Sequence, residues 1–108
     1  ETLAVASPQD AVLRFEIGVL QLRLGNKGRA RQAFERALQI APTYANAKWY
    51  LAALYEESGD VGDAIRQLED LLVMNPDDAQ VKARLQLLKT AQTDAVRAEA
   101  VEPLATGN

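Results

Sequence analysis

The sequence of 108 residues contains no cysteine and no histidine. Disulfide bonds, thiolate nucleophiles, imidazole bases and the usual zinc sites are therefore excluded. The remaining candidates for chemistry are acidic clusters such as Asp60-Val-Gly-Asp63 and Glu56-Glu57. Because these clusters are typical of helix caps and solvated helix ends, we expect no enzyme activity, no bound metal and no cofactor.

Long hydrophobic runs are missing as well. No stretch of about 18 apolar residues is present that would span a bilayer, so we expect no membrane insertion. The first residues, ETLAVAS, have neither an initiator methionine nor the basic start of a signal peptide. We interpret residues 1–7 as a linker remnant of a processed or excised piece, whose compartment the sequence leaves unknown.

One segment of the chain occurs twice. Gly25 to Pro42 (GNKGRARQAFERALQIAP) returns 34 residues later as Gly59 to Pro76 (GDVGDAIRQLEDLLVMNP). Glycine, alanine, a large apolar residue, leucine and proline all return in register. A fixed period of this size indicates stacked structural repeats, which carry binding surfaces more often than catalytic sites.

The first unit is predicted to be a helix hairpin. Ser7, Pro8 and Asp10 together signal a helix start, through a capping hydroxyl, a first-turn proline and a carboxylate. A helix follows to Leu24 and a second runs from about Lys27 to Ile40, joined by a turn so short that they must be antiparallel. Apolar spacings of three and four predict two buried stripes. They consist of Leu13, Ile17, Leu20 and Leu24 in the first helix, and of Ala30, Phe34, Ala37 and Leu38 in the second.

The second unit repeats this plan, with Gly59-Asp60 at its turn. Its predicted buried residues are Ala47, Leu51 and Leu54 in the first helix, and Ala64, Ile65, Leu68 and Leu72 in the second. A third copy begins near Asp78, but Thr93 stands where a turn glycine is expected. The sequence therefore predicts one long closing helix over about 78–100, ended by Pro103.

These residues resemble the tetratricopeptide repeat, a helix-turn-helix unit with the pattern W-x-x-L-G-x-x-Y, A-x-x-x-F and P. Unit one reads Arg14-x-x-Ile17-Gly18-x-x-Gln21, Ala30-x-x-x-Phe34, Pro42, and unit two reads Lys48-x-x-Leu51-Ala52-x-x-Tyr55, Ala64-x-x-x-Leu68, Pro76. Basic residues replace the family's tryptophan, and Leu71 replaces a preferred alanine. Gly18, Ala30, Ala52 and Ala64 would keep the helix crossings close.

The resemblance implies an all-α, right-handed solenoid of five helices: two helix-turn-helix repeats and a long C-terminal capping helix. The expected boundaries are a single domain over 8–102, with repeats at about 9–42 and 43–76, a capping helix at about 78–100 and a disordered tail at 103–108. The segment from Tyr44 to Lys82 is similar to the last repeat and closing helix of C-terminal repeat modules in long bacterial proteins, some of them membrane-anchored.

Similar repeats bind peptides on the concave side, which the first helix of each pair lines. By resemblance, the partner-binding residues here would be Val12, Phe15, Val19, Leu22, Asn46, Trp49, Tyr50, Ala53, Arg84 and Leu87, with Glu16, Arg23, Glu56, Gln80 and Ala83 alongside. Phe15 and Trp49, one period apart, would stack as neighbours. Receptors of this family that bind a terminal carboxylate use lysine and asparagine side chains on this face. In this sequence, only Arg84 matches that pattern.

The extra apolar stripe on the first helix leaves three interpretations open. It can form a groove for an apolar or amphipathic peptide, pack against a preceding repeat or residues 1–7, or serve self-association. The function we predict is a non-catalytic scaffold for protein interaction. The alternatives are a self-association module, as a homo-oligomer or head-to-tail assembly, and the C-terminal end of a longer repeat scaffold.

The net charge of −3 conceals a division between the two units. Residues 11–44 hold six basic and two acidic residues, whereas residues 45–78 hold two basic and eight acidic residues. The basic unit of one molecule can dock on the acidic unit of another, or these charges can simply be solvated. Nucleic acid is not an expected partner, because the acidic unit and the pI of about 4.9 oppose the basic patch.

Overall fold

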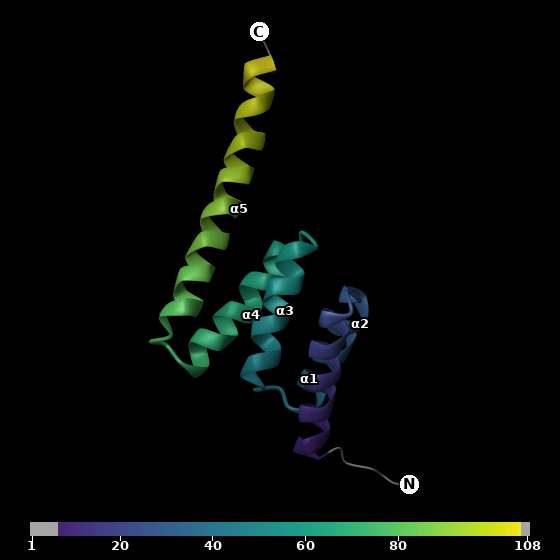
Figure 1. The fold of residues 1–108 in the computed structure, drawn as a ribbon. Helices are drawn as coiled ribbons and strands as arrows, with labels where there is room; N and C mark the ends of the chain where they lie inside the picture. The colour runs from purple at the N-terminus through teal and green to yellow at the C-terminus, as the bar shows by residue number, and fades with distance from the viewer. Residues whose placement is uncertain (1–6, 107–108) are drawn as a thin grey trace.

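The computed structural model describes residues 7–106 of the chain, with side chains up to residue 97. Within this range the chain forms five helices and no strand: α1 (Pro8–Arg23), α2 (Lys27–Ile40), α3 (Ala45–Glu57), α4 (Val61–Met74) and α5 (Ala79–Thr106). Figure 1 shows two helix hairpins, α1 with α2 and α3 with α4, followed by a long α5 that packs beside α4. The expected all-α solenoid of five helices is therefore confirmed.

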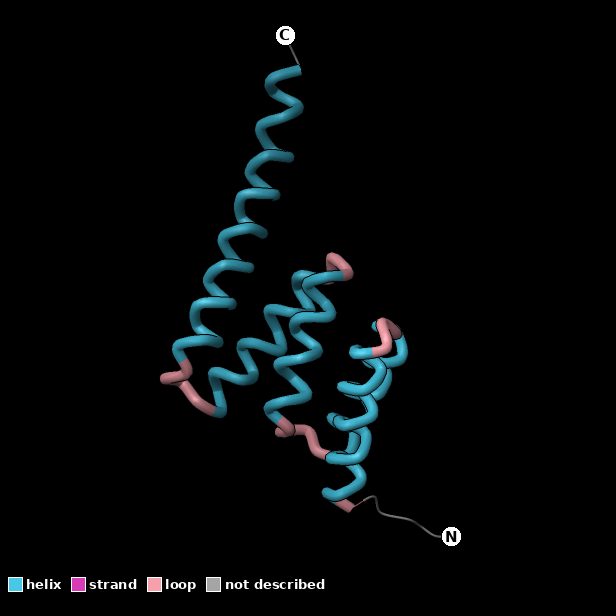
Figure 2. Tube along the Cα trace, in the orientation of Figure 1, coloured by secondary structure: helices cyan, strands magenta, loops and turns pink. Residues whose placement is uncertain are grey.

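Each hairpin turns at a glycine in the left-handed region, where a side chain would be strained. Gly25 has a φ of 83° and Gly59 a φ of 86°. In the first turn the backbone N–H of Asn26 donates to the carbonyl of Gln21 over 2.8 Å, and the same bond recurs one period later at the end of α3. These bonds satisfy the last carbonyl groups of the helix and hold the short turns seen in Figure 2.

Carboxylates mark the starts of α1 and α5. The backbone N–H of Ser7, just before α1, donates to the Asp10 carboxylate over 2.9 Å. The backbone N–H of Val81, in the first turn of α5, donates to the Asp78 carboxylate over 3.1 Å. Each carboxylate satisfies a backbone donor near a helix end that has no intrahelical partner. The predicted start signal at Ser7 to Asp10 is confirmed.

The helices of a pair cross where their side chains are small. Gly18 of α1 is buried, and a methyl group added to it would lie 2.5 Å from the ring of Phe34, which is fully buried in α2. Ala30, Ala52 and Ala64 are buried as well. The predicted close crossings are confirmed, because the ring of Phe34 occupies the space that a side chain at Gly18 would need.

Two hydrophobic clusters form the core, one for each interface between a hairpin and the next first helix. The α2–α3 cluster consists of Ala30, Phe34, Ala37, Ala47, Leu51 and Leu54. The α4–α5 cluster consists of Ala52, Ala64, Ile65, Leu68, Leu71, Val81, Leu85 and Leu88. Tyr55 packs against both clusters. The predicted buried stripes of α3 and α4 are confirmed, although Leu72 is only half-buried.

The predicted core stripe of α1 is wrong. Leu13, Leu20 and Leu24 are 53%, 54% and 63% exposed, and Ile17 is half-buried. The opposite stripe packs instead, since Phe15, Val19 and Leu22 contact the α2–α3 cluster. The physical reason is that α1 has helices on one side, whereas α3 and α5 each lie against the second helix of the hairpin before them.

The predicted end of the closing helix is also wrong. The helix α5 begins at Ala79 and continues through Pro103 to Thr106, beyond the predicted end near Ala100. A proline removes one backbone hydrogen bond but does not always end a helix, and alanine and glutamate, good helix formers, precede this one. Residues 1–6 of the expected linker and 107–108 of the expected tail lie outside the described residues.

Candidate functional site

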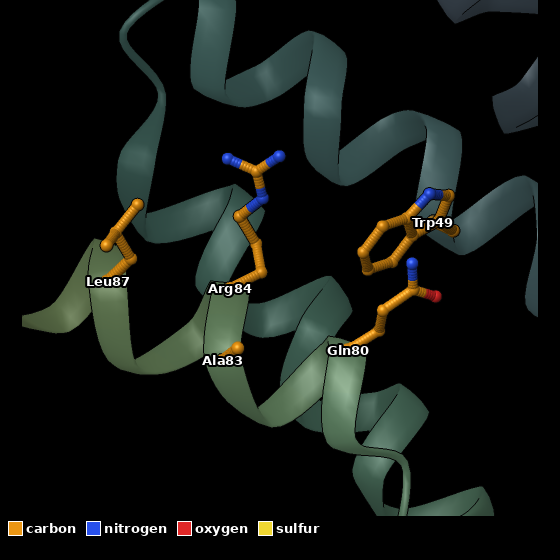
Figure 3. Close-up of a pocket in the computed structure, with 5 residues that line it drawn as sticks. All are labelled: Trp49, Gln80, Ala83, Arg84 and Leu87. Atoms are coloured by element: carbon orange, nitrogen blue, oxygen red, sulfur yellow. The ribbon is translucent and has the colours of Figure 1, made fainter.

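An open groove lies between α3 and α5. It has a volume of about 310 Å³ and is lined by Trp49 from α3 and by Gln80, Ala83, Arg84 and Leu87 from α5. Figure 3 shows the indole of Trp49 facing Gln80, with the guanidinium of Arg84 reaching into the space between the two helices. All five residues are among those that the resemblance assigned to the concave side. The structure therefore brings one third of the predicted lining together at this groove.

A smaller hollow continues the groove toward the core. It is bordered by Trp49, Ala52, Ala53, Glu56, Leu68 and Arg84. Trp49 and Arg84 line both spaces. Ala52 and Leu68 form part of the core and were not predicted as lining, because the sequence pattern assigned Ala52 to a helix crossing and Leu68 to a buried stripe. Their place at the hollow depends on how far α5 stands from α3, which no repeat pattern specifies.

The charge in the groove belongs to an ion pair. The Nη1 atom of Arg84 lies 3.4 Å from Oε2 of Glu56, and both side chains are partly exposed. Exposed pairs of this kind contribute about 0–1 kcal/mol. Because the pair is weak, an incoming carboxylate or carbonyl can replace Glu56 at Arg84 at little cost. The groove thus combines two apolar side chains from different helices, Trp49 and Leu87, with one guanidinium, that of Arg84.

The space between α1 and α3 is filled rather than open. The ring of Phe15 stacks on Tyr44 with centroids 5.1 Å apart and lies 5.5 Å from the ring of Tyr50. Tyr50 in turn stacks on Phe34 at 5.3 Å. The ring partners of Phe15 within the described residues are these three side chains, and Trp49 packs against the α4–α5 cluster. The expected stacking of Phe15 with Trp49 is therefore not what the structure shows.

The repeat period explains why the space between α1 and α3 is filled whereas the space between α3 and α5 is open. Tyr50 and Arg84 are one period apart, as are Phe15 and Trp49. Between α1 and α3, the ring of Tyr50 covers Phe15. Between α3 and α5, Arg84 takes the place of that ring beside Trp49. The flexible side chain of Arg84, with its solvated guanidinium, does not fill the volume that an aromatic ring would fill.

The other predicted lining residues divide between packing and exposure. Val19 and Leu22 are half-buried against the α2–α3 cluster, so they belong to the packing of α1. Val12 and the α3 residues Asn46 and Ala53 are exposed. Of the ten residues predicted for partner binding, Trp49, Arg84 and Leu87 meet at the open groove, and Ala53 borders the hollow beside it.

Other kinds of site find little support in the described part of the chain. Residues 7–97 bring together no cluster of three histidine, cysteine or acidic side chains that would hold a metal ion. Every helix that the structure describes is too short or too polar to span a bilayer.

Stacked helix hairpins closed by a further helix define a helical-repeat protein of the solenoid class. The family model of the tetratricopeptide repeat matches residues 22–89, more than half of the chain, and the chain belongs to this family. No curated protein matches the sequence. Tetratricopeptide repeats generally mediate protein–protein interactions and typically act as non-enzymatic scaffolds.

Proposed function

We propose that the chain is a protein-interaction module that binds an apolar or amphipathic polypeptide segment in the groove between α3 and α5. The observation that carries the proposal is that two large apolar side chains, Trp49 and the 62% exposed Leu87, line the same groove. Large apolar side chains around a concave site are typical of ligand-binding surfaces.

The groove also suggests the polarity of the bound segment. An apolar side chain of the segment would lie against Trp49 and Leu87, while a carboxylate or backbone carbonyl would accept a hydrogen bond from Arg84. Gln80 adds an amide that both donates and accepts. An amphipathic helix or an extended strand with one anchoring apolar residue fits this arrangement.

Binding can be followed through the protein's own fluorescence, because Trp49 is the single tryptophan of the sequence. Peptides selected from a displayed random library on the 108-residue chain should shift the emission of Trp49 on titration. The substitution Leu87→Glu should weaken binding about tenfold or more, equivalent to ~1.4 kcal/mol, since it replaces one of the two apolar side chains of the groove with a charge.

The matched control is Val73→Glu, at an apolar residue of α4 that is 82% exposed and outside the groove. This variant should bind the selected peptides as the parent chain does. Equal affinity for the Leu87→Glu and Val73→Glu variants, or binding without a change in Trp49 emission, would rule out the α3–α5 groove. Phe15→Ala is unsuitable as a probe, because Phe15 is part of the packing between α1 and α3.

A further inference from the structure

The exposed leucine stripe of α1 matches two faces that are buried elsewhere in the molecule. One period separates Leu13, Ile17 and Leu20 from Ala47, Leu51 and Leu54 of α3, and two periods separate them from Val81, Leu85 and Leu88 of α5. All six of the later residues are buried. The corresponding face is thus buried on α3 and on α5 but exposed on α1.

The covering element is the same in both buried cases. The α3 residues pack against α2, and the α5 residues pack against α4. In each case the second helix of a hairpin lies on the first helix of the next unit. Its contact face carries an alanine, a large apolar residue four positions later and an apolar residue three positions after that, as in Ala64, Leu68 and Leu71.

We propose that the Leu13–Ile17–Leu20 face of α1 is the docking site for the second helix of a further repeat, placed directly before α1 in the same polypeptide. We expect this helix to cross α1 in the way that α2 crosses α3 and α4 crosses α5. The interface on α1 would then continue a packing arrangement that the molecule already uses twice.

A polar contact that recurs at both existing interfaces indicates that the docking helix should carry a carboxylate. Glu35 of α2 accepts a hydrogen bond from Tyr55 of α3 at 2.9 Å, and one period later Glu69 of α4 lies 3.2 Å from Nζ of Lys89 of α5. The residue of α1 in this register is Gln21. Its side-chain carbonyl accepts from Asn26, which leaves its amide group to donate to a carboxylate.

The size of the face favours a helix like α4 over one like α2. The α1 stripe starts with Leu13, where α5 has Val81 and α3 has only Ala47, so it resembles the face that α4 covers. Charge does not decide between the two kinds of helix, because α1 carries Asp10 and Glu16 against Arg14 and Arg23 and has no net charge. A helix with the large apolar residues of α4 is therefore the better match for this stripe.

A second copy of the chain fits the face less well. Where Gly18 and Ala52 receive the second helix of their own hairpins, α5 has the exposed Gln86, flanked by Lys82 and Lys89. Among the described side chains, the first turns of α5 therefore offer no apolar surface in register with the α1 stripe of another copy.

The test is a fusion protein that places a second helix of the α4 type against the Leu13–Ile17–Leu20 face. A copy of residues 45–78 is joined directly before Ala11, so that Asp78 stands where Asp10 stands in the parent chain and the period continues. We expect the thermal midpoint to rise by several degrees and the amide exchange of α1 to slow by about tenfold or more.

The substitution Leu20→Lys separates docking from a general effect of added chain. In the parent chain it should leave the thermal midpoint nearly unchanged, because Leu20 is exposed. In the fusion it should remove most of the gain and restore fast exchange in α1. The control Val96→Lys, at an exposed residue of α5, should leave the gain intact.

Two results would overturn the proposal. The first is α1 exchange as fast in the fusion as in the parent chain, or a gain that Leu20→Lys leaves unchanged. The second is sedimentation of the parent chain as a stable dimer that Leu20→Lys dissociates, which would assign this face to a second copy.

Discussion

The packing of α1 on α2 depends on the missing side chain of Gly18. A Cβ atom there would lie 2.5 to 2.8 Å from three ring carbons of Phe34, and that ring is fully buried. Such distances are far shorter than ordinary contacts between carbon atoms. The ring cannot move aside without disturbing the α2–α3 cluster to which it belongs.

We expect Gly18→Ala to lower the free energy of unfolding by about 1–3 kcal/mol through overpacking, even after the helix-propensity gain of ~1 kcal/mol. The control is Gly28→Ala in α2, where an added Cβ has no neighbour within 4 Å. That substitution should be neutral or stabilise by up to ~1 kcal/mol. Urea unfolding of both variants checks the pair, and equal effects would contradict the role of the Phe34 contact.

Tyr55 connects the two repeats through a half-buried phenol. Its hydroxyl group donates to Oε2 of Glu35 over 2.9 Å, and its ring packs against both hydrophobic clusters. Burial, followed by the hydrogen bond to the Glu35 carboxylate, raises the pKa of Tyr55 from 10.0 to about 12. A raised pKa in the folded state means that folding favours the protonated phenol.

The stability that this phenol contributes should be complete below pH 10 and lost as the pH rises through about 12. At neutral pH, Tyr55→Phe should cost about 0.5–1.5 kcal/mol for the hydrogen bond. Above pH 10 the difference between the parent and the variant should shrink. Urea unfolding across this range, with ultraviolet titration of tyrosinate, measures both effects. A titration step near pH 12 that persists in Tyr55→Phe would contradict the assignment.

At the scale of elements, α5 divides into a packed part and a projecting part. Val81, Leu85 and Leu88 are buried against α4, whereas residues 89–97 are all exposed. Figure 1 shows the later turns of α5 extending beyond the two hairpins. A helix segment without tertiary contacts gains little from packing, which is the main source of helix stability in proteins.

We therefore expect a chain that ends at Thr93 to unfold with nearly the same free energy as the full chain, within about 0.5 kcal/mol. Leu88→Ala, in the packed part of α5, should instead cost about 2–5 kcal/mol. Thermal and urea unfolding compare the two. A large loss on truncation would show that the projecting turns contribute to the fold.

The elements also show how far sequence reasoning reaches. Helix bounds followed closely from Gly25, Gly59 and the Ser7 to Asp10 start signal, because caps and turns act over a few residues. The stripes of α1 were assigned to the wrong sides. A helix with two apolar stripes has the same periodicity whichever stripe is buried, so its neighbours decide.

At the scale of the whole molecule, the two ends of the solenoid differ. The chain measures 67 × 31 × 29 Å. Its α1 end presents leucines, while the outer side of α5 presents Lys82, Gln86 and Lys89. Among the described side chains, the exposed face of α1 is therefore apolar and the outer side of the first turns of α5 is polar.

The opposite charges of the two repeats meet partly within one molecule. Lys27 of the basic unit lies 3.2 Å from Oε1 of Glu57 in the acidic unit. This contact is exposed and contributes little to stability. Head-to-tail assembly through these charges stays a hypothesis.

The sequence by itself determined the repeat period, the helix bounds up to the last turns of α5, the glycine turns and the family, because these depend on local residue types and their spacing. The resemblance also placed Trp49, Arg84 and Leu87 among the expected binding residues, and these three meet at one groove. Only the tertiary structure decided that Tyr44 and Tyr50 fill the space beside Phe15, that the groove opens between α3 and α5, and that the leucines of α1 are uncovered. Burial is a property of pairs of helices, and a stripe on one helix does not specify its partner.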